Sequence, residues 1–287
     1  MHRSVMLAES LEYLAVRPDG IYLDATAGLG GHTGAIARRL TTGFVIASDR
    51  DEESLQLARE NTADCRERIK FVQARFSELR GVLARLGVVK VDGLLADLGV
   101  SRYQLTTPDR GFSLMYAGPV DMRMDRSEEQ TAADIVNFTA EKALADLIYQ
   151  LGDERRARII ARALVRARPI RDTVHLASVV ESVVHRTSGI HPATRTFMAL
   201  RLAVNREQDE LDSLLADAPG LVKTEGRMVV ITFMSLEDRK VKERFRELGR
   251  QGAVRILTKH VVPPSDEEVR ANPASRSAKL RAIEVVG

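Results

Sequence analysis

A glycine-rich run directly after a short apolar stretch is the first segment of this sequence that could bind a ligand. Residues 24–33 read Asp-Ala-Thr-Ala-Gly-Leu-Gly-Gly-His-Thr, and the β-rich residues before them are typical of a strand. Glycines at a strand-to-helix turn let a ligand approach the backbone, and the unpaired N–H groups of a helix N-terminus bind polar groups. The run therefore predicts a ligand-binding turn. A tight turn that binds nothing is the alternative.

Two further side chains follow the next two predicted strands. Asp49 ends a strand roughly twenty residues further on, where a carboxylate can accept hydrogen bonds from both hydroxyls of a ribose. Its alternative role is to cap the helix that starts near Asp51. Phe76 follows the third strand, where its ring could cover an adenine. The alternative for Phe76 is a core aromatic that opens an amphipathic helix.

A third acid, Asp97, ends the fourth predicted strand. In an open parallel sheet, ligands bind beyond the carboxyl ends of the strands, so Asp97 is expected to share a crevice with Gly30 and Asp49. A carboxylate and nearby backbone carbonyls can orient an amine nucleophile and stabilise the positive charge that develops on it. Asp97 could instead contact only a bound cofactor, or serve the fold alone.

The elements that would position these side chains alternate along the first hundred residues. The predicted strands are 20–26, 44–49, 69–72 and 91–97, and the predicted helices are 32–40, 51–61 and 76–86. Strands separated by helices of about 10–15 residues indicate an α/β fold with a parallel, doubly wound sheet.

The alternation stops after residue 101. Helical patterns then cover 132–138, 141–149, 154–166 and 174–185, with no convincing buried strand between 102 and 205. Strand-like segments return at 227–233, 254–257 and 279–286, together with a charged helix at 236–248 and a loop at 263–273. We therefore predict a core in two parts, residues 1–101 and 206–287. A mostly helical insertion at 102–205 separates them.

Composition limits the class of protein. The chain has 287 residues, of which 44% are hydrophobic and 29% charged, so disordered and fibrous classes are excluded. No run approaches the roughly 18 apolar residues of a membrane helix, and the first residues lack the pattern of a signal peptide. Cys65 is the only cysteine, which excludes an intramolecular disulfide. These features predict a cytoplasmic protein.

Basic side chains suggest where a nucleic acid could bind, since the net charge of +3 permits such a partner. One stripe of a predicted helix carries four arginines, and three more basic residues add to the positive charge around it. Such a stripe could bind a phosphate backbone. The alternative is a solvated helix face with salt bridges to Asp153 and Glu154. The stripe is Arg155, Arg158, Arg162 and Arg166, and the added residues are Arg156, Arg168 and Arg171. All of them lie in the insertion at 102–205, whose predicted role is RNA recognition. A second cluster, with a similar ion-paired alternative, is Arg276, Lys279 and Arg281. His185 and His191 lack the acid and the spacing of a metal site, so no metal is predicted.

The type of glycine turn narrows the ligand. A dinucleotide fingerprint would place glycine at position 33, where this chain has threonine. The pattern Asp-x-x-x-Gly-x-Gly-Gly looks more like the turn of a class I S-adenosylmethionine-dependent methyltransferase. In methyl transfer the protein mainly positions two reactants for an in-line displacement.

Motifs along nearly the whole chain resemble the bacterial small-subunit (16S) ribosomal RNA cytosine-N4 methyltransferases. The most specific of them is the run Gly118–Asp125, Gly-Pro-Val-Asp-Met-Arg-Met-Asp. The other matching segments are His2–Glu9, Asp24–His32, Asp97–Ser101, Arg110–Ser113, His191–Phe197, Ser235–Lys242 and Ser275–Arg281.

This resemblance implies a Rossmann-like class I core with a helical insertion and S-adenosyl-L-methionine as cofactor. The implied reaction methylates the exocyclic N4 of a cytidine in the decoding region of 16S rRNA, within the small ribosomal subunit. The implied cofactor residues are Gly30, Gly31, His32, Asp49, Phe76, Asp97 and Gln104. Asp97 is also the predicted catalytic residue. The sequence is compatible with a homodimer without defining the oligomeric state.

The chain departs from the family pattern at three places. Arg102-Tyr103 stands where the family usually has Ser-Pro, Met234 where it usually has histidine, and Ala274 where arginine usually follows Asn-Pro. These positions are expected on the substrate side, so they bear on the target nucleotide. Tyr103 could stack on a flipped base, or lie in a surface loop.

Three other functions stay open from the residues. An amino-methyltransferase for DNA or another RNA usually carries an Asp/Asn/Ser-Pro-Pro-aromatic loop, where this chain has Asp97-Leu98-Gly99-Val100. Thr33 argues against a nicotinamide-dependent oxidoreductase. A non-catalytic ribosome-assembly binder would fit the basic helix but leaves the cofactor turn without a role.

Overall fold

The protein is described by a computed structural model that covers residues 4–184 and 189–287. The chain divides into two compact units, of which the first ends at Gly99 and resumes at Gln208, and the second is Val100–Glu207. The expected boundaries, after residues 101 and 205, lie within two residues of these. The role of the second unit in RNA recognition stays a prediction.

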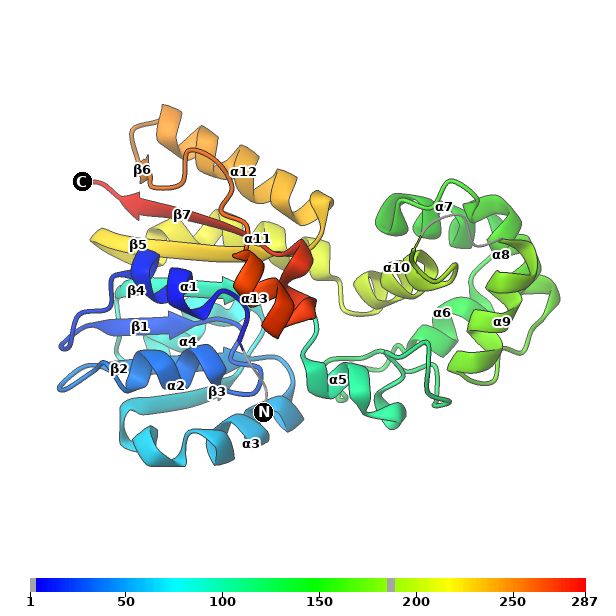
Figure 1. Ribbon diagram of the computed structural model, residues 1–287, viewed down its shortest axis with the longest axis horizontal. Helices are drawn as coiled ribbons and strands as arrows, with labels where there is room; N and C mark the ends of the chain where they lie inside the picture. The colour runs from blue at the N-terminus through cyan, green and yellow to red at the C-terminus, as the bar shows by residue number, and fades with distance from the viewer. Residues whose placement is uncertain (1–3, 185–188) are drawn as a thin grey trace. The chain divides into compact units, whose positions relative to one another are not determined.

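Within the described residues, the first unit contains one mixed sheet of seven strands (Figure 1). Its order is β3-β2-β1-β4-β5-β7-β6, and all neighbours from β3 to β5 are parallel, whereas β7 is antiparallel to both β5 and β6. The strands are β1 (Ile21–Asp24), β2 (Phe44–Asp49), β3 (Ile69–Gln73), β4 (Val91–Asp97), β5 (Val222–Thr232), β6 (Val254–Ile256) and β7 (Lys279–Val285). A doubly wound α/β sheet is therefore confirmed.

The strand order reverses between β1 and β4, which is where ligands bind in such sheets. Asp24 lies beside Ala47 of β2 and Leu95 of β4 in register. Because these strands are parallel, their carboxyl ends meet at one edge of the sheet. Asp24, Asp49 and Asp97 therefore all lie at that edge.

Helices cover both faces of the sheet. One core contains side chains of α4 (Leu79–Arg85), α11 (Glu207–Leu221) and α12 (Ser235–Arg250), and the other contains α1 (Leu7–Leu14), α2 (Gly31–Ala37) and α3 (Glu52–Asn61). Strand β4 is buried along almost its whole length, and its central residues Leu94, Leu95 and Ala96 are apolar, as expected for a strand that is covered on both faces. Burial on both faces holds the strand ends, and hence the acids that follow them, in fixed positions.

The second unit has its own hydrophobic core and, in its described residues, consists of helices and loops. Its α-helices are α5 (Arg102–Thr106), α6 (Ala132–Phe138), α7 (Glu141–Gly152), α8 (Ala157–Arg166), α9 (Thr173–Val183) and α10 (Thr194–Val204). The family-specific run 118–125 is fixed inside this unit. The buried Arg110 side chain donates to the carbonyls of Arg123 and Met124, each at 3.0 Å, and the Asn205 side chain bonds the backbone of Met122 and Met124.

Several elements differ from the sequence prediction. The expected loop at 263–273 is wrong, because Ser265 caps a helix there, α13 (Asp266–Ala271), by accepting the N–H of Glu268 at 3.1 Å. The helix expected at 76–86 is divided into the 3-10 turn η2 (Phe76–Glu78) and α4. Helices α1, α5, α10 and α11 were not predicted. Helix α1 follows Met6, whose φ of 51° and apolar side chain give no capping signal.

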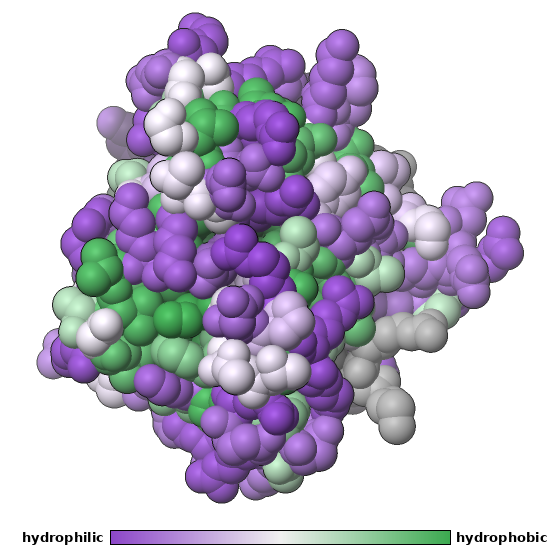
Figure 2. All heavy atoms as spheres, turned by 90° about the vertical axis from the view of Figure 1, so that its left-hand side faces the viewer, coloured by the Kyte–Doolittle hydropathy of each residue, from purple (hydrophilic) through white to green (hydrophobic). Residues whose placement is uncertain are grey.

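The opposite edge of the sheet, at the amino ends of the parallel strands, is held together by charge. Asp92 of β4 accepts hydrogen bonds from the Ile21 N–H at 2.8 Å, from Lys223 at 2.9 Å and from Arg17. Figure 2 shows this face as largely hydrophilic, with apolar side chains between the polar ones. Across residues 4–184 and 189–287, no helix combines the length and apolar character needed to cross a membrane.

Candidate cofactor site

The glycine turn between β1 and α2 is shaped by the buried carboxylate of Asp24. Its oxygens accept hydrogen bonds from the Thr33 hydroxyl at 2.6 Å and from the Thr26 N–H at 3.1 Å. Burial raises the pKa of Asp24 to about 6, and these hydrogen bonds oppose the rise. Thr33, which stands where a dinucleotide fingerprint has glycine, therefore stabilises this turn through its hydrogen bond to Asp24.

Gly30 is required by the turn itself. Its φ of 84° lies in the left-handed region, and a Cβ built on it would lie 3.0 Å from Thr62 Cγ2 and 3.2 Å from Ala58. A side chain here would be strained and would press on helix α3. Glycine at this position therefore keeps the turn tight and lets α2 begin close to α3.

Asp49 links this turn to the end of β2. It accepts hydrogen bonds from the N–H groups of Gly28 at 2.8 Å and Asp51 at 2.9 Å. The alternative role as a helix cap is wrong, because Asp51 caps α3 by accepting from Glu53 and Ser54. Burial raises the pKa of Asp49 to about 6. A carboxylate at this edge fits the predicted ribose contact, which stays a prediction.

Asp97 is the acid with an unused hydrogen-bonding atom. Its backbone N–H donates to the Thr26 hydroxyl at 2.6 Å, which fixes the end of β4 against the glycine turn. Its Oδ1 is buried and accepts no hydrogen bond from the described residues. Burial raises its pKa well above the usual value, and the acids Asp24, Glu237 and Glu268 add to the rise.

A buried carboxylate oxygen without a donor is costly to the folded protein, and native structures rarely keep one without a reason. Asp92, on the same strand, differs from Asp97, because both of its carboxylate oxygens accept hydrogen bonds. The Oδ1 atom of Asp97 is therefore suited to accept a hydrogen bond from a ligand. It lies at the same carboxyl edge of the sheet as Asp24 and Asp49, beside the switch point, and a shared crevice with Gly30 and Asp49 stays a prediction.

His32, the second residue of α2, is buried between Asp97 and the N-terminal segment. Its Nδ1 lies 3.8 Å from Asp97 Oδ2, and its Nε2 lies 3.1 Å from the carbonyl oxygen of Val5. The segment Ser4–Met6 crosses the start of α2 so closely that a Cβ on Gly31 would lie 1.8 Å from Ser4 Oγ.

The same segment is anchored from the C-terminal part of the chain. The Met6 N–H donates to Glu268 of α13 at 2.6 Å. Sequence reasoning missed this contact because it placed Glu268 in a loop. The available signal was the capping residue Ser265, three positions before Glu268.

Two predicted cofactor residues, Phe76 and Gln104, lie outside the glycine turn and the strand ends. Phe76 begins η2 and packs, half-buried, against the core on one face of the sheet, as its alternative role requires. Gln104 belongs to the second unit, where its amide oxygen accepts the Ser101 N–H at 2.9 Å and the Ser101 hydroxyl accepts the Gln104 N–H at 3.2 Å. Their contacts with a cofactor stay predictions.

The basic residues separate into exposed and structural ones. Arg155, Arg158 and Arg166 are exposed, and Arg162 pairs with Glu141 at 3.4 Å rather than with Asp153 or Glu154. Arg168 donates to the carbonyl of Val136 at 2.9 Å. In the C-terminal cluster, Arg281 is buried and pairs with Asp238 at 2.7 Å, so the ion-paired alternative holds for this residue.

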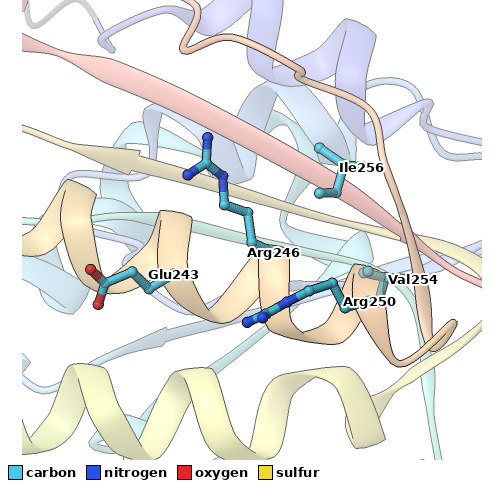
Figure 3. A pocket seen from close by; sticks show the side chains of 6 residues that line it. Glu243, Arg246, Arg250, Val254 and Ile256 are labelled. Atoms are coloured by element: carbon cyan, nitrogen blue, oxygen red, sulfur yellow. The ribbon is translucent and has the colours of Figure 1, made fainter.

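No group of three or more metal-ligating side chains occurs in the part of the chain that the structure describes. His191 pairs with Glu181 at 3.0 Å, and His185 lies outside the described residues. A surface groove of about 750 Å³ lies between α12 and β6 (Figure 3). It is lined by Glu243, Arg246, Gly249, Arg250, Val254 and Ile256, and it contains none of the predicted site residues.

The fold and the site define a class I methyltransferase. The fold is shared by the crystal structure of a candidate rRNA-methylase from Clostridium thermocellum, with a TM-score of 0.50, 12% sequence identity and coverage of 100% of both chains. The chain belongs to the MraW methylase family, whose model matches residues 1–286. S-adenosyl-L-methionine is accordingly its cofactor.

Curated relatives match along the whole chain. A protein of Solibacter usitatus named "Ribosomal RNA small subunit methyltransferase H" is 65% identical over 285 residues, which cover 99% of this chain and 100% of the relative. A protein of the same name from Koribacter versatilis is 48% identical over 98% of this chain and 93% of the relative. A third, from Gloeobacter violaceus, is 46% identical over 98% of this chain and 87% of the relative.

Proposed function

We propose that this protein transfers a methyl group from S-adenosyl-L-methionine to the exocyclic N4 of a cytidine in the decoding region of 16S rRNA. The names of the relatives support ribosomal RNA of the small subunit as the substrate. The motif resemblance, above all the run 118–125, supports cytosine N4 as the target. The observation that carries the chemistry is the buried Oδ1 of Asp97, which has no donor among the described residues.

Different residues of the first unit would bind different parts of the cofactor. When bound, S-adenosyl-L-methionine supplies an electrophilic methyl group. The backbone at Gly30 and Gly31 would hold its amino-acid part, and Asp49 would accept its ribose hydroxyls. The carboxylates are placed by strand ends that are buried on both faces, so little reorganisation is needed when the ligand binds.

Asp97 would act on the nucleophile. The N4 amine of cytosine carries two N–H bonds, and one of these protons must leave when the N–C bond forms. Asp97 Oδ1 would accept a hydrogen bond from that N–H, which aligns the amine and stabilises the positive charge developing on it. Burial strengthens this interaction because little water is present to screen it.

The second unit would supply RNA affinity. Arg155, Arg158 and Arg166 are exposed cations along α8 and its N-terminal approach, a pattern suited to a phosphate backbone. A contact of this kind carries no sequence information, so it would hold the RNA while the site in the first unit selects the base.

The experiment is methyl transfer from tritiated cofactor to small ribosomal subunits isolated from a strain that lacks this protein. Naked 16S rRNA, large subunits and duplex DNA serve as parallel acceptors. The proposal predicts label in small subunits or their rRNA at a single cytidine. Label only in DNA or in another RNA would contradict it. Cofactor binding with no transfer to any acceptor would instead indicate a non-catalytic binder.

A further inference from the structure

We propose that His32 is a positioning residue, held by the backbone carbonyl of Val5, that keeps Asp97 ionised so that it can accept the proton lost by the methylated amine. The pairing of His32 with Asp97 rests on geometry alone. Its use in proton transfer rests on the function proposed above.

The carbonyl of Val5 determines which nitrogen of the His32 ring carries a hydrogen. A carbonyl oxygen only accepts hydrogen bonds, so the Nε2 atom of His32, 3.1 Å away, must carry the hydrogen. The hydrogen-bond partner of one imidazole nitrogen influences whether the other nitrogen is protonated. The Nδ1 atom lies on the side of the ring that faces the carboxylate, 3.8 Å from Asp97 Oδ2.

Val5 is itself held in place. The next residue, Met6, is fully buried, and its N–H donates to Glu268 at 2.6 Å. Ser4, on the other side, lies against the backbone of Gly31. The carbonyl that orients His32 is therefore fixed from both sides by the first unit.

A proton must belong to the pair of His32 and Asp97. A neutral ring protonated on Nε2 would present the lone pair of Nδ1 to a carboxylate oxygen, and two acceptors facing each other repel. Either Nδ1 is protonated and faces an ionised carboxylate, or the carboxyl group itself carries the proton. The separation of 3.8 Å is that of an ion pair rather than of a short hydrogen bond.

The other charged groups that act on Asp97 are acids. Asp24 from β1, Glu237 from α12 and Glu268 from α13 all favour the protonated carboxyl, in addition to burial. A positive His32 ring acts in the opposite direction, because an opposite charge within about 4–6 Å favours the ionised form. His32 is thus the described neighbour suited to keep Asp97 ionised.

The proton balance of the reaction follows from this pairing. The lone pair of N4 forms the N–C bond as the S–C bond breaks, and the electron pair of the broken bond stays on sulfur. One N4 proton moves to Asp97 Oδ1, which leaves a neutral carboxyl beside the positive ring. The proton passes to water when the product leaves, and the ionised carboxylate is restored.

The pairing can be tested in the full chain without cofactor or RNA. Nitrogen shifts of ¹⁵N-labelled histidine rings report which ring nitrogens carry protons over a pH titration. We expect His32 to keep a proton on Nε2 throughout, and Asp97→Asn to lower the pH at which its Nδ1 titrates by about one unit. As a control, Glu181→Gln, which removes the ion-pair partner of His191, should leave the titration of His32 unchanged.

A proton on Nδ1 alone, or an unchanged titration of His32 in D97N, would overturn the pairing. This outcome is independent of whether the enzyme methylates rRNA, so it is distinguishable from a failure of the proposed function. A failure of the proposed function would appear in the acceptor assay with the wild-type protein.

The role in catalysis has its own readout. In His32→Gln the carboxylate loses its positive neighbour, so the acidic limb of the kcat profile should move to higher pH, and kcat at neutral pH should fall by about 100-fold. Activity should be partly regained near pH 9, with KM for the RNA nearly unchanged. A uniform loss of kcat at every pH would show a structural role only and would overturn the proposal.

Discussion

Two aspartates on one strand show how position decides the role of a residue. Asp92, at the amino end of β4, would have a raised pKa from burial alone, but hydrogen bonds from the Ile21 N–H and Lys223 lower it. Asp97, at the carboxyl end, has a pKa raised well above its usual value by burial and by three nearby acids. Asp92 therefore stabilises the fold as a carboxylate, whereas ionised Asp97 destabilises it in the absence of a ligand.

The first prediction concerns the replacement of Asp97 by Asn. Because the pKa of Asp97 is raised in the folded protein, the folded state binds more protons than the unfolded chain above about pH 4, and stability falls as pH rises. We expect D97N to raise the Tm at pH 8 by at least about 2 °C, with little effect near pH 3.5. Methyl transfer should fall by at least about 100-fold.

The matched control is D92N on the same strand, which should lower the Tm at pH 8 because Asp92 loses satisfied hydrogen bonds. Scanning calorimetry and the acceptor assay measure both effects. A D97N protein that is destabilised at pH 8, or that keeps wild-type activity, would contradict the role given to Asp97.

The second prediction concerns Asp49 and pH. Burial raises the pKa of Asp49 to about 6, and the ionised form is the one that can accept two ribose hydroxyls. Cofactor affinity should therefore weaken as pH falls through about 6, and Asp49→Asn should weaken it about 10- to 100-fold at pH 8 and flatten the pH dependence.

Titration calorimetry at several pH values provides the measurement for Asp49. Asp64→Asn serves as the control, since Asp64 is exposed and pairs with Arg38 at the surface. Equal affinities of D49N and wild type at pH 8 would remove Asp49 from the cofactor site.

At the scale of elements, the glycine turn illustrates what a sequence can predict. The short strand, the three glycines and the acid before them identified the β1–α2 turn, because few other local structures use that pattern. The buried strands β2 and β4 were equally clear from their apolar residues. The acids at their ends followed from the parallel arrangement.

The contacts that complete the site could not be predicted in the same way. The segment Ser4–Met6, His32 and Glu268 meet across 262 residues of sequence, from Met6 to Glu268, and no local pattern specifies such a meeting. Helices α10 and α11 were missed for a related reason, since packing within the hydrophobic cores rather than capping defines them.

The third prediction tests the turn as an element. Gly30→Ala adds both strain at φ 84° and pressure on Ala58 and Thr62, whereas Gly252→Ala adds strain at φ 74° with nothing within 4 Å of the new Cβ. We expect G252A to lower stability by about 1 kcal/mol and G30A by about 1 kcal/mol more. Only G30A should weaken cofactor binding. Equal stability losses would show that the packing of α3 on the turn is unimportant.

In the whole molecule, basic side chains occur in both units, and we expect their positions to affect RNA binding more than the net charge does. The fourth prediction replaces Arg155, Arg158 and Arg166 together by Gln. Affinity for 16S rRNA should fall, and the slope of log affinity against log salt should decrease by about 2–3. Cofactor affinity should not change, because none of these three arginines is a predicted cofactor residue.

The control removes the same charge from another surface, by replacing the exposed Arg246 and Arg250 and the partly exposed Lys242 of α12 with Gln. Equal losses of rRNA affinity in the two triple variants would show a non-specific effect of net charge and would contradict a role for the helical unit. The same preparations can be analysed by sedimentation, where a homodimer would appear as a doubled mass.

The most direct measurement of the central claim locates the transferred methyl group. Small ribosomal subunits lacking this modification are incubated with deuterated-methyl cofactor and either wild-type protein or D97N, and the rRNA nucleosides and fragments are analysed by mass spectrometry. We expect a deuterated N4-methylcytidine at one decoding-region position with the wild type, and none with D97N. A label on another base, on carbon or ribose, or one that D97N still produces at the wild-type rate, would contradict it.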